Sequence, residues 1–180
     1  MGRRIDALPG QCRVAWQKAR DFSFPKDYRD VDKVLVLGMG GSAIGGDLVA
    51  DLQAFEGGSP VEVYRGYDLP PLVDHRTLVI ASSFSGDTEE TVCACQQALV
   101  QGAKVVVLTR GGRLAALAEE HRVPVFHIDF QGEPRSGLGF SFFSLIAFLQ
   151  NLGLAPDRLR DVEEAIGEVE RFGEEINSRV

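Results

Sequence analysis

The sequence predicts an α/β fold: a three-layer α/β/α sandwich in which helices cover both faces of a five-stranded parallel sheet. Short apolar runs rich in β-branched residues alternate with stretches that carry helical signals, and this alternation is typical of a parallel sheet. The first, third and fourth runs have almost no polar alternation, which indicates strands buried on both faces. The expected strands are Val34–Leu37, Val61–Tyr64, Thr77–Ala81, Lys104–Thr109 and Val123–Ile128.

Apolar spacing and end signals predict the helices between these strands. The apolar residues of 42–55 fall on one helical stripe, formed by Ile44, Leu48, Val49, Leu52 and Phe55. The stretch 88–101 opens with acidic residues and is followed by Gly102, a favourable residue just after a helix end. Further helices are expected at 7–21, with Val14 and Trp16 among its apolar residues, at 111–121, at 140–151 and from 157 onward.

The chain of 180 residues has the length of one ordinary domain with helical appendages. We expect an amino-terminal helical segment at 1–33, the α/β domain at 34–155 and an acidic helix at 156–180. The apolar run 137–149 has two interpretations. It is either a helix buried under the sheet or a face that meets another domain or subunit.

Composition excludes several classes of protein. The net charge of −7 argues against a nucleic-acid partner, which requires a basic face. The run 137–149 is too short to cross a bilayer, and the amino terminus lacks the apolar stretch of a secretory signal. The odd set Cys12, Cys93 and Cys95 predicts reduced thiols in the cytoplasm. With the histidines scattered at His75, His121 and His127, we expect no metal.

Two loops that follow expected strands contain the residue types that bind a phosphate. The first, Gly38-Met39-Gly40-Gly41-Ser42, opens a helix whose amino terminus favours an anion, and its glycines let backbone N–H groups face a ligand. Gly38, Gly40 and Ala43 also match the dinucleotide fingerprint, but the second strand ends in Tyr64-Arg65-Gly66 instead of an acidic residue. A glycine-rich turn that only packs helix against sheet is the alternative.

The second loop, 82–88, carries hydroxyls around a glycine, which can surround the oxygens of one phosphate. The alternative is a helix cap, in which Ser85 or Asp87 accepts from free amides. If the first and third strands are neighbours, the two loops meet at the carboxyl edge of the sheet. A hydroxyl-lined site without lysine suits a sugar phosphate better than a nucleotide.

Three segments resemble those of sugar isomerase (SIS) domains, and among these the bifunctional phosphoglucose/phosphomannose isomerases. They are GMGGSAIGGD at 38–47, SFSGDTEET at 83–91 and PRSGLGF at 134–140. The resemblance implies an amino-terminal SIS domain with a flavodoxin-like fold. It also implies a cytoplasmic homodimer of glycolysis and gluconeogenesis, which interconverts glucose 6-phosphate or mannose 6-phosphate with fructose 6-phosphate and uses no cofactor.

The resemblance also implies roles for particular residues. Gly41 and Ser42 would contact the substrate. The phosphate would be held by Ser83, Ser85 and Thr88. Arg135 would stabilise the negative charge of a cis-enediolate, because proton transfer between C1 and C2 needs a fixed cation beside the developing oxyanion.

One departure from the resembled family concerns the general base. Those enzymes are roughly twice as long, and their base and ring-opening histidine lie in a second SIS domain. We therefore expect this chain to be half of such an enzyme, with weak binding of fructose 6-phosphate and little turnover. Glu89 and Glu90 suit a helix first turn whatever the function, His127 is expected to be a core or sheet residue, and Glu133 is not assigned as the base.

Two other functions stay open from the sequence. A single SIS domain can sense a sugar phosphate without catalysis, and such regulators usually carry a DNA-binding helix-turn-helix, for which residues 1–33 are too few. A nicotinamide-dependent oxidoreductase would rest on the fingerprint alone. Dinucleotide binding would decide that case.

Overall fold

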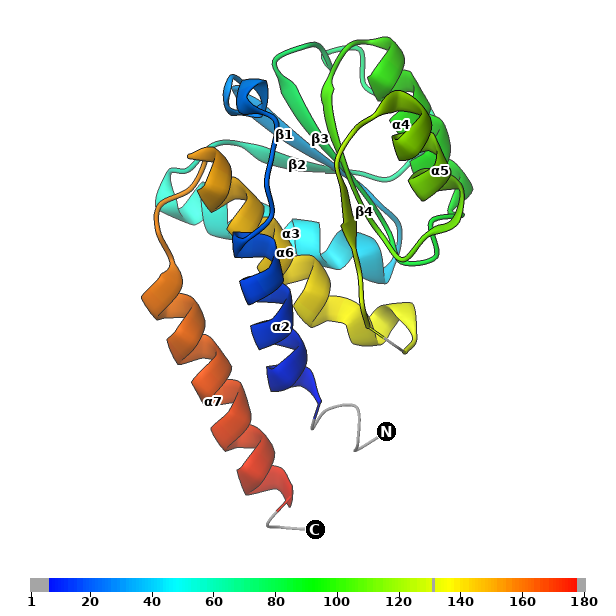
Figure 1. Ribbon diagram of the computed structural model, residues 1–180. Helices are drawn as coiled ribbons and strands as arrows, with labels where there is room; N and C mark the ends of the chain where they lie inside the picture. The colour runs from blue at the N-terminus through cyan, green and yellow to red at the C-terminus, as the bar shows by residue number, and fades with distance from the viewer. Residues whose placement is uncertain (1–6, 131, 178–180) are drawn as a thin grey trace.

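The computed structural model describes residues 7–130 and 132–177, which form one open sheet flanked by helices (Figure 1). All strand pairs are parallel, and the strand order is β2-β1-β3-β4-β5. The strands are β1 (Lys33–Leu37), β2 (Val61–Tyr64), β3 (Thr77–Ser83), β4 (Lys104–Thr109) and β5 (Val125–His127). The predicted five-stranded parallel sheet is therefore confirmed, and β1 and β3 are neighbours.

Helices form two layers around this sheet. One face is covered by α4 and α5, and the other by α3 and α6, with α2 packed outside α6 (Figure 1). The helices are α2 (Leu8–Arg20), α3 (Gly41–Glu56), α4 (Glu89–Val100), α5 (Gly112–His121), α6 (Leu138–Leu152) and α7 (Leu159–Asn177). Two short 3₁₀ helices that the sequence patterns did not predict are η1 (Lys26–Arg29) and η2 (Pro134–Gly137).

The central strands are buried on both faces, as their apolar runs predict. Every residue of β3 is buried, and β1 and β4 are buried after their first residue. Val34 and Val36 contact the α2–α6 side, whereas Leu35 and Leu37 contact the α4–α5 side. This division is the two-residue alternation of a strand with a helical layer on each face.

Helix α6 is buried, which decides between the two interpretations of the apolar run 137–149. It lies between α2 and α3, and Phe148 is fully buried with its ring centroid 5.2 Å from that of Phe126. Helix α7 packs along α2, where Arg13 Nη1 lies 2.6 Å from Glu170 Oε1. Within the described residues, no helix is both long and apolar enough to cross a bilayer.

The predicted apolar stripe of α3 is only partly correct, because Val49 is buried and Leu52 packs against the core, whereas the other three residues are exposed. Ile44, Leu48 and Phe55 are exposed, by 48%, 43% and 91%. The first half of the helix buries the small residues Ala43, Gly45 and Gly46, because it approaches the sheet and α6 very closely. A Cβ added at Gly46 would lie 3.0 Å from side-chain carbons of Val36 and Val63, and one at Gly45 would lie 2.5 Å from Ser141 Oγ. The close approach of neighbouring side chains to the α3 backbone selects glycine here, and three large apolar side chains are left on the outer face.

Two details at the edges of the fold differ from the simplest expectation. β5 is shorter than 123–128, because it pairs only with β4 and only over three residues. His127 is the last residue of β5 and is exposed, so it is a sheet residue, the second of the two alternatives expected for it. On α2, Trp16 is buried as expected, but Val14 is half exposed because it lies on the face turned away from α6.

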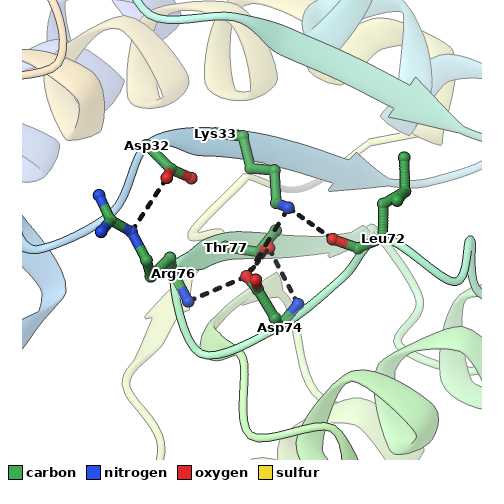
Figure 2. A network of polar contacts seen from close by, with 6 residues as sticks. All are labelled: Asp32, Lys33, Leu72, Asp74, Arg76 and Thr77. Carbon is green, nitrogen blue, oxygen red and sulfur yellow. Dashed lines mark hydrogen bonds and ion pairs between the residues drawn. The ribbon is translucent and has the colours of Figure 1, made fainter.

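Hydrogen bonds and ion pairs connect the starts of β1 and β3 at the amino edge of the sheet (Figure 2). Asp74 Oδ1 accepts hydrogen bonds from Thr77 Oγ1 at 3.0 Å and from the Arg76 N–H at 3.1 Å. Lys33 Nζ lies 3.7 Å from the same carboxylate oxygen, and Arg76 Nε lies 2.9 Å from Asp32. The network fixes the pairing of the two strands whose opposite ends carry the glycine and serine loops.

Candidate functional site

The glycine and serine loops meet at the carboxyl edge of the sheet, as the strand order requires. Leu37 is aligned with Ala81 in the parallel register, so the chain leaves β1 and β3 side by side. The first turn of α3 then contacts the second loop directly. The backbone N–H of Phe84 donates a hydrogen bond to Ser42 Oγ at 3.2 Å.

Ser83 is the buried centre of the second loop. Its side chain is nearly inaccessible, and its Oγ lies 2.8 Å from Thr88 Oγ1 and accepts from the Gly86 N–H at 3.1 Å. Thr88 is half-buried. The structure therefore brings Ser42, Ser83 and Thr88 together around one loop, two of them with part of the side chain accessible.

Ser85 lies on the outer side of the same loop. It is exposed, and its Oγ accepts from the Asp87 N–H at 3.2 Å. Asp87 Oδ1 in turn accepts from the Arg113 N–H at 2.9 Å, so Asp87 caps α5. The capping alternative is thus correct for Asp87, which caps α5 instead of α4, whereas Ser85 closes a turn within the loop.

Two helices begin at this edge without a side-chain cap. Gly40 precedes α3 and Thr88 precedes α4, and neither makes a capping hydrogen bond with a side chain. The second and third N–H groups of α3 already donate to backbone carbonyls, so the positive ends of the two helix dipoles are the main attraction for an anion here. Gly41 is the first residue of α3 and is half-buried beside Ser42.

The second loop is also fastened to the loop after β4. Gly86 has φ +81°, and a Cβ there would lie 1.8 Å from the Gly111 carbonyl oxygen, so only glycine fits. The Arg110 N–H donates to the Phe84 carbonyl at 3.2 Å, and the Leu114 N–H donates to the Gly86 carbonyl at 2.9 Å. Loop 84–88 is therefore held from both sides, by α3 and by α5.

The segment that contains Arg135 lies against this loop. Arg135 belongs to η2, and its side chain is outside the described part of the structure. η2 contacts α3, and a Cβ at Gly137 would be 3.7 Å from the Phe84 ring. Phe84 therefore joins the segment of Arg135 to the loop of Ser83.

Sequence reasoning missed Phe84 and Arg110 as parts of this site. Phe84 is 9% exposed and packs edge-on against Phe130, while the Arg110 guanidinium lies 5.2 Å from its ring centroid. Within the described residues, Arg110 is thus an exposed cation beside loops without lysine. A large aromatic residue inside a run of hydroxyls was the available signal.

The cysteines are unsuited to chemistry at this edge. Burial raises the pKa of Cys12 to about 11 and that of Cys95 to about 12, so both thiols stay protonated at neutral pH. Cys93 is half-buried on the same helix as Cys95. Among the described residues there is no group of three histidine, cysteine or carboxylate side chains arranged to hold a metal ion.

Solved structures of sugar-phosphate isomerases share this fold. Tagatose-6-phosphate ketose/aldose isomerase from Escherichia coli superposes with a TM-score of 0.65 at 17% identity, over 98% of this chain and 52% of that one. Bifunctional phosphoglucose/phosphomannose isomerases are among its sequence relatives. The protein of that name from Caldicellulosiruptor bescii is 42% identical over 88% of this chain and 47% of its own length.

A second protein of the same name, from Aquifex aeolicus, is 33% identical over 86% of this chain and 49% of its own length. No protein-family model matches the chain. The chain is therefore a homologue of the bifunctional phosphoglucose/phosphomannose isomerases and spans about half the length of the curated relatives it matches.

Proposed function

We propose that this chain supplies the phosphate-binding half of an enzyme that interconverts glucose 6-phosphate or mannose 6-phosphate with fructose 6-phosphate. The observation that carries the proposal is the junction of Ser42, Ser83 and Thr88 at the uncapped starts of α3 and α4. The similarity to proteins named phosphoglucose/phosphomannose isomerase supports the choice of a hexose phosphate.

The phosphate group would be bound by neutral donors. The hydroxyls of Ser42, Ser85 and Thr88 and the backbone N–H of Gly41 are of the type that surrounds a phosphate dianion at a helix start. Buried Ser83 would act through Thr88, whose hydroxyl it contacts at 2.8 Å. The first-turn amides of α3 and α4 add favourable partial charge. This arrangement would anchor the end of the sugar that does not react and leave C1 and C2 free to extend toward η2.

Arg135 would act at the reacting end. A base takes the proton from C2 of the open-chain aldose, the C1 oxygen becomes negatively charged, and the C2 hydroxyl proton passes to that oxygen. Return of a proton to C1 completes the ketose. A guanidinium beside the enediolate would lower the barrier by stabilising this charge. We assign no general base within this chain and propose that the base belongs to another part of the enzyme.

A proton NMR time course of fructose 6-phosphate with the purified chain tests the proposal. Broadened substrate signals without new anomeric signals are expected, because the chain would bind the sugar phosphate and lack a base. New glucose 6-phosphate or mannose 6-phosphate signals would place the base within these residues. Unchanged spectra at millimolar ligand would refute the proposed substrate class, and joint binding of a hexose phosphate and a specific DNA site would favour a regulator.

We also propose that the enzyme is a homodimer in the cytoplasm and serves glycolysis and gluconeogenesis. The exposed apolar residues of α3, Ile44 and Leu48, lie next to the start of that helix at the site and support an interface there. The free cysteines Cys12 and Cys95 are buried and consistent with a reducing compartment. Light scattering of the purified chain, compared with a Leu48→Glu variant, tests the dimer.

A further inference from the structure

Gln11 is a buried polar residue of α2 at the start of α6. Its side chain is 7% exposed. Its Nε2 donates a hydrogen bond to the carbonyl oxygen of Ser136 at 2.9 Å, and Ser136 follows Arg135 in η2. Within the described residues its Oε1 is buried without a hydrogen-bond partner. A half-satisfied carboxamide is costly in the interior, so packing alone would favour an apolar side chain at this position.

Gly139 makes room for this carboxamide. A Cβ at residue 139 would lie 2.6 Å from Gln11 Oε1 and 2.9 Å from Cys12 Sγ, closer than packed atoms approach one another. Gly139 and Ser136 both belong to the PRSGLGF segment at 134–140. One side chain of α2 therefore contacts this segment at two points, one on each side of the turn from η2 into α6.

The contacts continue from η2 to the hydroxyl loops. Gly137 lies against the ring of Phe84, and the Phe84 N–H is bonded to Ser42. A second contact from α2 reaches the end of β5, where Lys18 Nζ donates to the His127 carbonyl at 2.8 Å. The position of η2 relative to the phosphate loops thus depends on α2 as well as on the sheet.

We infer that Gln11 is a positioning residue, which sets η2, and with it Arg135, relative to the phosphate loops. The inference rests on the proposed function for the role of Arg135. The interaction of a cation with a developing oxyanion depends steeply on distance and on a pre-set geometry. A residue that fixes the backbone position of such a cationic residue therefore affects binding of the reacting end of the ligand more than binding of its phosphate.

Calorimetry with two ligands can distinguish an effect on binding of the reacting end from an effect on binding of the phosphate. The variant is Gln11→Met, which keeps side-chain length and removes the donor, and the matched control is Gln17→Met, an exposed glutamine on the same helix. The ligands are fructose 6-phosphate and a five-carbon aldonate 5-phosphate, whose carboxylate has the charge and planarity of an enediolate. Gln11→Met is expected to lower the affinity for the aldonate by about tenfold and that for fructose 6-phosphate by less than about twofold. Gln17→Met should change neither affinity.

Hydrogen exchange of the peptide 132–140 provides a readout that needs no ligand. Exchange is expected to be faster in Gln11→Met and in Gly139→Ala than in Gln17→Met. Unchanged aldonate affinity together with unchanged exchange in Gln11→Met would overturn the inference. If the parent chain binds neither sugar phosphate, the proposed function fails, and the exchange rates alone then decide whether Gln11 holds η2.

Discussion

The hydroxyl of Ser42, in the first turn of α3, accepts a hydrogen bond from the backbone N–H of Phe84 across the boundary between the two loops. This contact joins the chain after β1 to the chain after β3. It also uses the acceptor side of the Ser42 hydroxyl. The proton of the hydroxyl is then free to be donated to a ligand oxygen.

Replacement of Ser42 by alanine should weaken both the loop junction and ligand binding. The Phe84 N–H loses its acceptor, which should lower the free energy of unfolding by about 1 kcal/mol. The affinity for fructose 6-phosphate should fall by about tenfold, because one donor to the phosphate is lost. Urea unfolding and calorimetry measure the two effects. Ser23→Ala, an exposed serine outside the loops, should change neither, and equal affinities of Ser42→Ala and the parent would contradict the assignment.

Two glycines with similar backbone angles should respond very differently to alanine. Gly86 has φ +81° and Gly102 has φ +76°, but only at Gly86 would the new Cβ collide with backbone, at Gly111. Gly102→Ala should therefore lower the free energy of unfolding by about 1–2 kcal/mol, the cost of the left-handed conformation. Gly86→Ala should lower it by more than about 4 kcal/mol. Chemical denaturation of the two variants compares them, and similar losses would mean that the loops after β3 and β4 are not in contact.

Thiol labelling should distinguish the three cysteines. At pH 8 an aromatic disulfide reagent should react readily with Cys93, which is half-buried. Cys12 and Cys95 should react only on unfolding, because burial raises the pKa of both thiols and blocks access to them. Cys93→Ala should then abolish the early reaction, whereas Cys95→Ala should leave it unchanged. Early labelling of the Cys93→Ala protein would show that the interior opens readily.

Because of Asp74, the stability of the protein should vary with pH in the acid range. The hydrogen bond from Thr77 is the main reason that the pKa of Asp74 is lowered. A carboxyl whose pKa is lowered in the folded state stabilises the fold at pH values above the ordinary aspartate pKa. This stabilisation is lost as the pH falls through the folded-state pKa. Asp74→Asn should therefore lower the melting temperature at pH 7, and the difference from the parent should shrink below about pH 4. Asp51→Asn, an exposed aspartate on α3, is the control, and a difference that persists at pH 2 would contradict this account.

The repeating elements of the fold could be predicted from the sequence because their signals are local. Val61–Tyr64 and Lys104–Thr109 form strands with the predicted bounds, and Thr88 and Gln101 flank α4 as its end signals indicate. The outer face of α3 could not be predicted in this way. Its large apolar residues suggested a buried stripe, whereas the contact with Val36 and with α6 demands the absence of side chains, and that is a property of the partner surfaces.

Contacts within the candidate site could be predicted where the residues share a loop. Ser83 and Thr88 are five residues apart and meet directly. Gln11 and Ser136, in contrast, are 125 residues apart, and nothing in the local pattern around Gln11 indicates its partner. Contacts of this kind depend on how α2 packs on α6, so they emerge only when the tertiary structure is known.

The fastening of loop 84–88 to its neighbours has a consequence for how a ligand is captured. The loop is tied to Ser42 on one side and to Arg113 and Leu114 on the other, so it has little freedom to fold around an arriving anion. Its donors are ordered before the ligand arrives, and little conformational entropy is lost on binding. Association should therefore be a single fast step, and any slow rearrangement during a catalytic cycle would belong to segments other than this loop.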